Sequence, residues 1–392
     1  MPVANLAKVL NWDACVECGE CLSRCRYMEF TLDEAREEIG KVNRGEASRA
    51  LAGCMSCYAC NAFCEKGAHP YERIHYAWNE RYEREGLPAR ASYLMPSRRP
   101  NFREDLSFSP EERELHGRWG GDDPPARTVL YPGCNLLTMP LLVPDAVMEV
   151  LPVWGRWDLC CGEMFFRMGI LSKVDEIARR LTDFYAKKRI GEMVFVCPAG
   201  YNMFRNVLPR QFGARFSFRI TFFTEWFDRA VRKGELKIVR RLQGEAVIQD
   251  SCHARVLGTK FMDSQRRLLE GLGLTLRETR ETREDGLCCG MAAGCNAYGA
   301  FDLLRHSMRN LRALDRAGGR EIVQYCTGCL LTSSVMRAVN PFGKRLTHTL
   351  EWVGLALGER RPRRHYRRAL SVLKGIVIHA LPRYLSRKRF RL

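Results

Sequence analysis

Cysteine is the residue type with the most chemistry to offer in this chain. There are 18 cysteines among 392 residues, and most of them fall in short groups with two or three residues between neighbours. The first residues, Met1 to Asp13, lack the charged start and long apolar stretch of an export signal, so we expect a reducing, cytosolic location. In such a compartment, clustered thiols indicate metal binding rather than disulfide bonds.

Two of these groups share one spacing, C-x2-C-x2-C-x3-C. The first runs from Cys15 to Cys25 and the second from Cys54 to Cys64. Three thiolates two residues apart can cover three corners of an iron–sulfur cubane, while the fourth cysteine starts the next segment and binds the other cluster. The spacing therefore predicts one [4Fe–4S] cluster held by Cys15, Cys18, Cys21 and Cys64, and a second held by Cys54, Cys57, Cys60 and Cys25. Zinc knuckles or buried thiols are the alternative, which is disfavoured because zinc ligands usually come in two pairs.

The second half of the chain is an internal repeat, and its cysteines recur with it. Cys160-Cys161-Gly162 returns as Cys288-Cys289-Gly290 after 128 residues, and Cys197 returns as Cys326 after 129. A near-constant offset indicates a duplicated domain. The first repeat contributes Cys134, Cys160, Cys161 and Cys197, and the second contributes Cys252, Cys288, Cys289, Cys326 and Cys329.

The elements that carry these cysteines are predicted from the runs beside them. In each repeat a short β-branched run ends at a cysteine, within Thr128 to Cys134 or Ala246 to Cys252, and such a run is typical of a buried strand. Helical patterns follow, and strands that alternate with helices predict a parallel sheet with its ligands at the carboxyl ends of the strands. We expect an α+β multidomain fold, with a largely helical N-terminal domain followed by two repeated α/β domains with short parallel sheets.

These motifs resemble known families. Residues 8 to 75 resemble the bacterial two-cluster ferredoxin domain, except that Arg26 and Glu65 stand where that family usually has proline. The order Cys…Cys-Cys-Gly…Cys-x-x-Cys resembles the cysteine-rich CCG domain of heterodisulfide reductases, glycolate oxidase and anaerobic glycerol-3-phosphate dehydrogenase. As a whole, residues 8 to 358 resemble the heterodisulfide reductase D subunit and its bacterial relatives. The resemblance implies that a non-cubane [4Fe–4S] cluster, which splits a disulfide in one-electron steps, is held by Cys252, Cys288, Cys289, Cys326 and Cys329.

The first repeat lacks the last of the five cysteines, because Gly200 replaces it. Its four thiols, Cys134, Cys160, Cys161 and Cys197, suit a zinc ion or a simpler cluster better than a five-cysteine site. The glycine after each Cys-Cys pair predicts a close backbone approach, with amide N–H groups directed at sulfur. The alternative is that this glycine only ends a strand.

Three further residues each have more than one interpretation. His253, next to Cys252, either donates a proton to a leaving thiolate or serves as a hydrogen-bond donor beside the cluster. Arg255 either screens cluster charge or binds an anionic substrate, although a surface salt bridge is the commoner fate of an arginine. Cys295 is expected to be a core cysteine rather than a further thiol at the site.

The predicted boundaries follow from the motifs and from charge. We assign a two-cluster domain to 1–95, a Pro-rich linker to 96–126, the first repeat to 127–230, a linker to 231–244, the second repeat to 245–358 and a basic tail to 359–392. The formal net charge is +18, and twelve Lys or Arg with no Asp or Glu lie between Arg360 and Leu392. Apolar residues recur at helical spacing from Tyr366 to Leu381, which favours a helix on an anionic membrane surface. Docking on the chain's own core or on a partner subunit is the alternative, and nucleic acid is not expected because no such motif accompanies the basic run.

Together these patterns predict an iron–sulfur electron-transfer subunit of a redox complex, which relays electrons through two cubanes to a cluster in the second repeat. Expected partners are a flavin-bearing dehydrogenase, an electron carrier or a membrane quinone or cytochrome subunit, and the expected location is the cytoplasm or the cytoplasmic face of the inner membrane. Without a phosphate loop or dinucleotide fingerprint, neither flavin nor NAD is expected on this chain. One alternative is a disulfide reductase that acts at the second-repeat cysteines with His253, and a more distant one is a zinc-binding scaffold.

Overall fold

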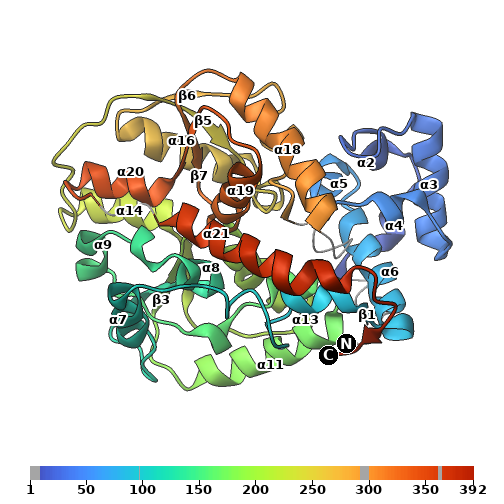
Figure 1. The fold of residues 1–392 in the computed structure, drawn as a ribbon, viewed down its shortest axis with the longest axis horizontal. Coiled ribbons are helices and arrows are strands. Elements are labelled where there is room, and N and C mark those ends of the chain that lie inside the picture. The colour runs from blue at the N-terminus through green and yellow to red at the C-terminus, as the bar shows by residue number, and fades with distance from the viewer. Residues whose placement is uncertain (1–8, 97, 292–299, 361–363) are drawn as a thin grey trace.

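The computed structural model describes residues 9–96, 98–291, 300–360 and 364–392 (Figure 1). Its N-terminal part consists of helices, with Cys21 and Cys60 inside two of the short ones and the other six of the first eight cysteines in the segments between helices. The helices are η1 (Trp12–Ala14), α2 (Glu20–Ser23), α3 (Leu32–Arg44), α4 (Arg49–Gly53), α5 (Ala59–Phe63) and α6 (Pro70–Glu85). Helix α3 starts at a capping box in which Thr31 and Glu34 exchange hydrogen bonds, and α6 starts with a proline in its first turn.

The first repeat forms a three-stranded parallel sheet in the order β2-β3-β4, with bounds Thr128–Tyr131, Glu192–Phe195 and Arg219–Phe222. Leu130 also makes a single parallel bridge to Val153. The helices around the sheet are α8 (Gly133–Thr138), α9 (Asp145–Val150), α10 (Glu163–Arg167), α11 (Leu171–Ala186), α12 (Pro198–Asn202), α13 (Leu208–Phe212) and α14 (Phe223–Arg232). The strands are buried on both faces, as expected for a parallel sheet covered by helices.

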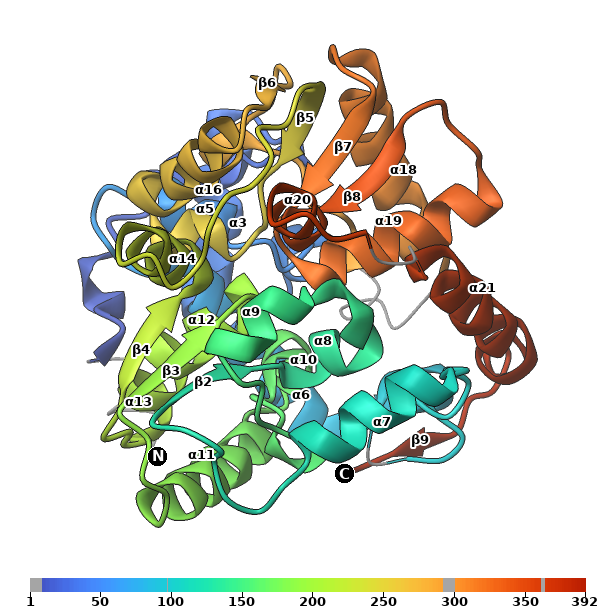
Figure 2. The ribbon, with the colours of Figure 1, turned by 90° about the vertical axis from the view of Figure 1, so that its left-hand side faces the viewer.

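The second repeat forms a four-stranded parallel sheet in the order β6-β5-β7-β8, with bounds Thr275–Arg277, Glu245–Gln249, Glu321–Gln324 and Arg345–His348. Its helices are α15 (Ala254–Leu257), α16 (Thr259–Gly271), α18 (Ala300–Arg316), α19 (Thr327–Val339) and α20 (Thr349–Ala356). Strands β5, β7 and β8 match β2, β3 and β4 in order, and Figure 2 shows the two sheets as separate groups of arrows. The fold is the α+β arrangement with short parallel sheets that the sequence predicts.

The repeats differ at one edge of the sheet. Where the second repeat has β6, the first has only the Leu130–Val153 bridge. The first repeat is about ten residues shorter between its first cysteine and its Cys-Cys pair. The missing length therefore coincides with the missing strand.

The strand ends determine where the repeat cysteines lie. Cys134 and Cys197 follow β2 and β3, and Cys252 and Cys326 follow β5 and β7. Because neighbouring parallel strands end at the same edge, each pair is brought to one side of its sheet. A continuous apolar core packs both sheets together, including Val194 of β3 and Ile322 of β7.

The segment before the first repeat and the tail after the second lie against each other. The first contains β1 (Leu87–Pro88), η2 (Ala89–Leu94) and α7 (Pro110–Trp119), and the second contains α21 (His365–Gly375), η7 (Ile376–Ala380), η8 (Leu381–Arg383) and β9 (Arg389–Phe390). Strand β9 pairs antiparallel with β1, and α21 packs against α19. In the described part of the chain, no helix has both the length and the apolar character required to span a membrane.

Candidate metal centres

The first predicted cluster set comes together around a small cavity. All four of its cysteines line a cavity of about 60 Å³, namely Cys15, Cys18, Cys21 and Cys64. Burial and the negative charge of the other three thiols raise the pKa of Cys21. The Asn43 side-chain amide donates to the Cys15 sulfur at 3.3 Å, and the Ala68 backbone N–H donates to the Cys64 sulfur at 3.4 Å. Four sulfurs that face one space, with donors behind them, are what a cluster requires.

The second predicted set also comes together, and it touches the first. Burial raises the pKa of Cys60, and so do the charges of its neighbours, Cys54, Cys21, Cys57 and Cys25. Three of these neighbours are the other members of the set, and the fourth, Cys21, belongs to the first set. The Ser56 backbone N–H donates to the Cys54 sulfur at 3.3 Å.

The five second-repeat cysteines form one buried group at the carboxyl ends of β5 and β7. Each is at most 7% exposed, and they are Cys252, Cys288, Cys289, Cys326 and Cys329. Side-chain hydrogen bonds link Cys252 to Cys288, Cys288 to Cys289, Cys289 to Cys329 and Cys329 to Cys326. The Cys288 backbone N–H donates to the Tyr27 hydroxyl at 2.6 Å, so the N-terminal part packs directly on this group.

The four first-repeat cysteines line one cavity, but their sulfurs have different partners. Cys134, Cys160 and Cys161 hydrogen-bond to one another in series. Cys197 instead hydrogen-bonds to Cys326 of the second repeat, and its sulfur accepts from the Asn135 side chain at 3.4 Å. Cys197 therefore connects the two repeats.

The glycine after each Cys-Cys pair has a positive φ and a helix against it. A Cβ at Gly290 would lie 2.2 Å from Ser307 Oγ on α18, and one at Gly162 would lie 2.9 Å from Ile177 on α11. The backbone of Gly162 also hydrogen-bonds to the Cys160 sulfur. Close packing by a helix thus requires glycine here, and in the first repeat the amide is directed at sulfur as expected.

Beside Cys252 lies a buried charged group that the sequence analysis does not predict. Arg167 is 3% exposed; its Nη2 donates to the Cys252 sulfur at 2.9 Å and its Nη1 to the Ser56 carbonyl. It also pairs with Glu163, whose Oε1 lies 2.8 Å from His253 Nε2. Burial opposes ionisation of Glu163, but the charge of Arg167 and the hydrogen bond from His253 outweigh it and lower the pKa of Glu163 to about 2.

His253 is enclosed by this group. It is 1% exposed, with Nε2 against Glu163 and Nδ1 3.3 Å from the Asn202 side-chain amide. Both ring nitrogens are therefore already engaged. The geometry supports the interpretation of His253 as a hydrogen-bonding residue beside the site more than as a proton donor to substrate.

The expectation of a surface salt bridge for Arg255 is wrong. The side chain is 5% exposed, and its Nη1 donates to the Cys57 carbonyl at 2.6 Å while its Nη2 donates to the Gly286 carbonyl. It joins the loop of the second cluster set to the loop before the second-repeat Cys-Cys pair. Cys295, the remaining cysteine, lies outside the described residues.

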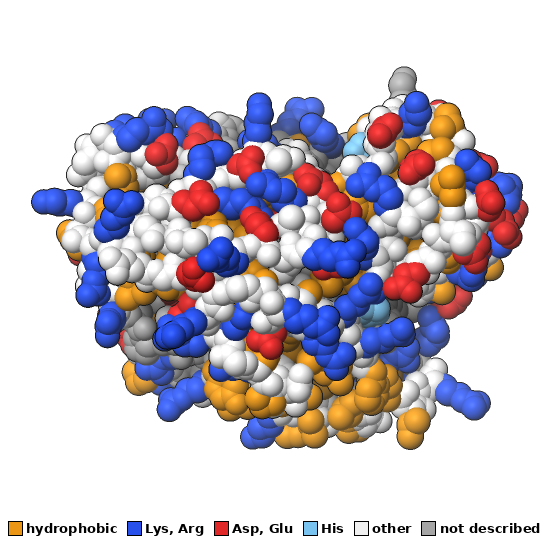
Figure 3. All heavy atoms as spheres, turned by 90° about the horizontal axis from the view of Figure 1, so that it is seen from above, with side chains coloured by type: hydrophobic (Ala, Val, Ile, Leu, Met, Phe, Trp, Pro, Cys, Tyr) orange, Lys and Arg blue, Asp and Glu red, His pale blue; other side chains and the backbone are white. Residues whose placement is uncertain are grey.

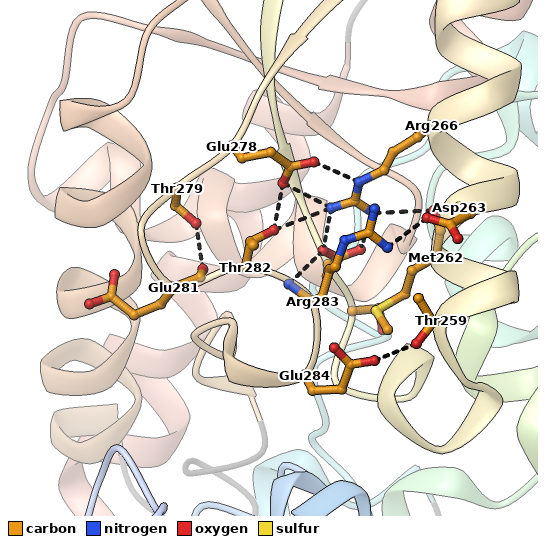
Figure 4. Close-up of polar contacts among 12 residues, drawn as sticks. Thr259, Met262, Asp263, Arg266, Glu278, Thr279, Glu281, Thr282, Arg283 and Glu284 are labelled. Atoms are coloured by element: carbon orange, nitrogen blue, oxygen red, sulfur yellow. Dashed lines mark hydrogen bonds and ion pairs between the residues drawn. The ribbon is translucent and has the colours of Figure 1, made fainter.

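The residues just before Cys252 are held by a buried ion-pair network (Figure 4). Both Asp250 carboxylate oxygens accept hydrogen bonds from Arg266 on α16, at 3.0 and 2.7 Å, and one of them also accepts from the Tyr325 hydroxyl at 2.7 Å. Arg266 in turn contacts Glu278, in the loop after β6. Because two elements fix Asp250, the loop that presents Cys252 is restrained from both sides.

Each of the four sets lies close to the next. Cys21 of the first set packs in one buried cluster with Cys54 and Cys60 of the second. Cys57 is near enough to Cys288 for its charge to raise the pKa of that thiol, and Cys326 hydrogen-bonds to Cys197. The same contacts appear in packing, since Cys57 lies in one buried cluster with the second-repeat cysteines and Cys197.

The thiols and the amide donors beside them are of the kind that iron–sulfur clusters use. No disulfide joins any of the described cysteines. In the described ranges, no three His, Cys, Asp or Glu side chains are arranged to hold one metal ion. Thiols that surround a space rather than a point, with amide donors at the sulfurs, fit an iron–sulfur cage.

Comparisons with known proteins agree with this chemistry. Residues 246–332 match the family model of the cysteine-rich domain CCG. The chain is 22% identical over 339 residues to the D subunit of the dihydromethanophenazine:CoB–CoM heterodisulfide reductase from Methanosarcina barkeri, and the match covers 74% of this chain and 80% of that protein.

Two further relatives are longer. The chain is 26% identical over 352 residues to the EtfAB:quinone oxidoreductase of Syntrophomonas wolfei, covering 73% of this chain and 48% of the relative. It is 30% identical over 145 residues to the probable iron-sulfur-binding oxidoreductase FadF of Bacillus subtilis, covering 36% of this chain and 20% of the relative. The chain thus spans about half of one relative and a fifth of the other. It carries a CCG cysteine-rich domain and resembles iron–sulfur oxidoreductases of the heterodisulfide reductase D type, as its cysteine motifs indicate.

Proposed function

We propose that this chain is an iron–sulfur electron-transfer subunit of a redox complex. The observation that carries the proposal is the succession of four cysteine sets, in which each set has a cysteine in the same buried cluster as a cysteine of the next set. Because the rate of electron transfer falls steeply with distance, adjoining sets suit a relay. An iron–sulfur cluster accepts and releases electrons singly, over a wide range of potentials that the protein sets.

In this proposal each set has a defined role. The N-terminal cysteines hold two [4Fe–4S] cubanes with the pairing that the spacing predicts, and the five second-repeat cysteines hold a third, non-cubane cluster. The first-repeat cysteines hold a simpler metal centre, and Cys197 connects it to the second repeat. Other redox subunits supply and remove the electrons.

A second candidate function is disulfide reduction at the second-repeat cysteines. The group of Arg167, Glu163 and His253 favours it, because a guanidinium beside the Cys252 sulfur stabilises negative charge on a thiolate. However, none of these five cysteines lines the apolar cavity beside the first-repeat cysteines, and each is at most 7% exposed. Enclosure of this kind favours the relay.

The tail supports a peripheral location for the subunit. Its outer face exposes Leu370, Val377, Ile378 and Leu385, which are 43%, 52%, 50% and 94% exposed. Figure 3 shows hydrophobic side chains gathered beside Lys and Arg along its lower edge. This edge is the face that is turned toward the viewer in Figure 1, where α21 lies. Contact with an anionic membrane surface predicts flotation with anionic liposomes. Flotation that persists undiminished in a Val377→Glu, Ile378→Glu variant contradicts it.

The experiment is anaerobic purification, with iron, sulfide and zinc counted and EPR spectra recorded during stepwise reduction. Three [4Fe–4S] clusters require about 12 irons, of which the two cubanes account for about 8. A Cys289→Ser variant should lose one EPR signal and keep the two cubane signals. Protein that contains zinc in place of iron and sulfide contradicts the proposal.

The second candidate is distinguished by adding a disulfide to the reduced protein. A new EPR signal from the second-repeat cluster, with release of free thiol, indicates catalysis. No response, together with rapid electron exchange with a reduced dehydrogenase, supports the relay.

A further inference from the structure

An apolar cavity lies between the first-repeat cysteines and the tail. Its volume is about 160 Å³, and its walls come from η2, α19, α21 and η7 in addition to the cysteine loops. An engineered apolar cavity of about 150 Å³ accommodates one benzene ring, so this space suits a single ring.

The cavity has two chemically distinct ends. At one end are Cys134, Cys160 and Cys161, with Arg103 close enough for its charge to favour the thiolate forms of Cys134 and Cys160. The other wall is apolar and is built by Val335, Val372, Ile376 and Ala380. A metal centre needs only the sulfur end, so the apolar wall indicates a separate occupant.

Two hydrogen-bond donors at this cavity lack acceptors. Arg103 Nε and the Tyr384 hydroxyl are buried, and neither has a hydrogen-bond partner within the described residues. Both side chains line the cavity. A buried donor without a partner costs free energy, so an occupant with acceptor atoms is favoured.

The tail faces the cavity on one side and the outside on the other. Val372, Ile376 and Ala380 point to the cavity, whereas Leu370, Val377 and Ile378 are about half exposed. The same short segment therefore joins an interior apolar space to an exposed apolar surface. A lipid-dissolved molecule could pass from one to the other.

We propose that this cavity binds a lipid-soluble quinone. Its flat apolar ring occupies the space beside the first-repeat cysteines, and its carbonyl oxygens accept hydrogen bonds from Arg103 Nε and the Tyr384 hydroxyl. This inference rests on the proposed electron-transfer function. Reduction of the quinone to its quinol consumes two electrons, which arrive singly through the cysteine sets from the dehydrogenase partner, and two protons, which come from water.

The test is equilibrium dialysis of the anaerobically purified full chain against a decyl-benzoquinone. We expect saturable binding of one molecule per chain. Ile376→Trp, which fills the cavity, should weaken binding at least tenfold, whereas the matched change Ile378→Trp on the exposed face should leave it unchanged. Tyr384→Phe, which removes only the hydroxyl, should weaken binding about fivefold.

Two results overturn the inference. One is equal affinity in the Ile376→Trp variant and the wild type. The other is equal weakening by Ile376→Trp and Ile378→Trp, which places the ligand on the outer surface. Iron content and cluster EPR of the same samples show whether the electron-transfer proposal still stands, so that failure of quinone binding is distinguished from failure of the relay.

Discussion

Arg167 brings a fixed positive charge to the second-repeat cysteines. Its guanidinium is buried and donates to the Cys252 sulfur at 2.9 Å, yet it comes from α10 of the first repeat. Reduction of a cluster adds negative charge, which a neighbouring cation stabilises. Charge and hydrogen bonds at the sulfurs are among the features that determine a cluster's potential.

We therefore expect Arg167→Gln to lower the reduction potential of the second-repeat cluster. The potentials of the two cubanes should stay unchanged, and Arg167→Lys should have a smaller effect because it keeps the charge. EPR-monitored redox titration measures the potentials of the second-repeat cluster and of the two cubanes in each variant. Arg205→Gln, at a more exposed arginine that contacts Tyr201, serves as the control. An unshifted potential in Arg167→Gln contradicts the assigned role.

Gly200 marks the place where a fifth cysteine is missing from the first repeat. A Cβ there would meet Phe195 and Tyr131 at 3.6 Å, which is ordinary contact. We expect Gly200→Cys to fold normally and to raise the iron content of the anaerobic protein to about 16. Iron and sulfide analysis checks this. An unchanged iron content, or a wild type that already contains about 16 irons, contradicts it.

At the residue scale, the sequence predicts what local spacing encodes. The eight N-terminal cysteines and the repeat cysteines follow from their motifs, and the structure groups them accordingly. Arg167 and Glu163 are not predictable in this way, because Arg167 lies 85 residues from the Cys252 it contacts and no matching motif exists in the second repeat. The only local signal is a Glu and an Arg four residues apart directly after Cys-Cys-Gly.

Helix α20 begins at a histidine that must stay neutral. His348 is fully buried, and its Nδ1 accepts the Leu350 backbone N–H at 3.2 Å. Burial lowers the pKa of His348 to about 4. An unfolded histidine has a pKa near 6.5, so the unfolded chain binds the proton more readily between these values.

The stability from His348 is therefore complete above about pH 6.5 and is lost as the pH falls toward 4. We expect His348→Asn, which keeps a capping oxygen but does not titrate, to flatten this part of the pH dependence. The free energy of unfolding, measured from pH 7 to pH 4.5, checks the prediction. Equal slopes for wild type and variant contradict it.

At the element scale, the strands that end at cysteines and the parallel sheets are predictable from short apolar runs. The helix in the tail is predictable from its spacing, but its orientation is not. The apolar residues of this helix are divided between the interior and the surface, because Ala369 is fully buried whereas Leu370 is 43% exposed. Which apolar residue faces inward depends on α19 and η2, which are distant in sequence.

The tail attaches to the whole molecule through a buried ion pair. Arg368 on α21 contacts Glu112 on α7, and both side chains are at most 2% exposed. Arg368 also donates to the Ser107 carbonyl. Removing one partner leaves the other as an uncompensated buried charge.

We expect Arg368→Ala to reduce the free energy of unfolding by about 3–5 kcal/mol. The double variant Arg368→Met, Glu112→Leu should recover most of this loss, because both groups are then apolar. Arg367→Ala, at the exposed neighbouring position, should have little effect. Urea denaturation followed by circular dichroism measures the free energy of unfolding of the three variants. A mild effect of Arg368→Ala indicates that the tail is not docked in solution.

At the scale of the whole molecule, the motifs predict the order of the parts but not the contacts between them. The links Cys57–Cys288 and Cys326–Cys197 join segments that no local pattern relates. They depend on packing of the N-terminal helices and both sheets around one buried cluster.

That enclosure has a consequence for biogenesis. The second-repeat sulfurs are covered by Tyr27 from the N-terminal part and by Arg167 from the first repeat. The five second-repeat cysteines are each at most 7% exposed, and parts distant in sequence cover them. We therefore expect iron and sulfide to be delivered most readily before these parts close over the sulfurs.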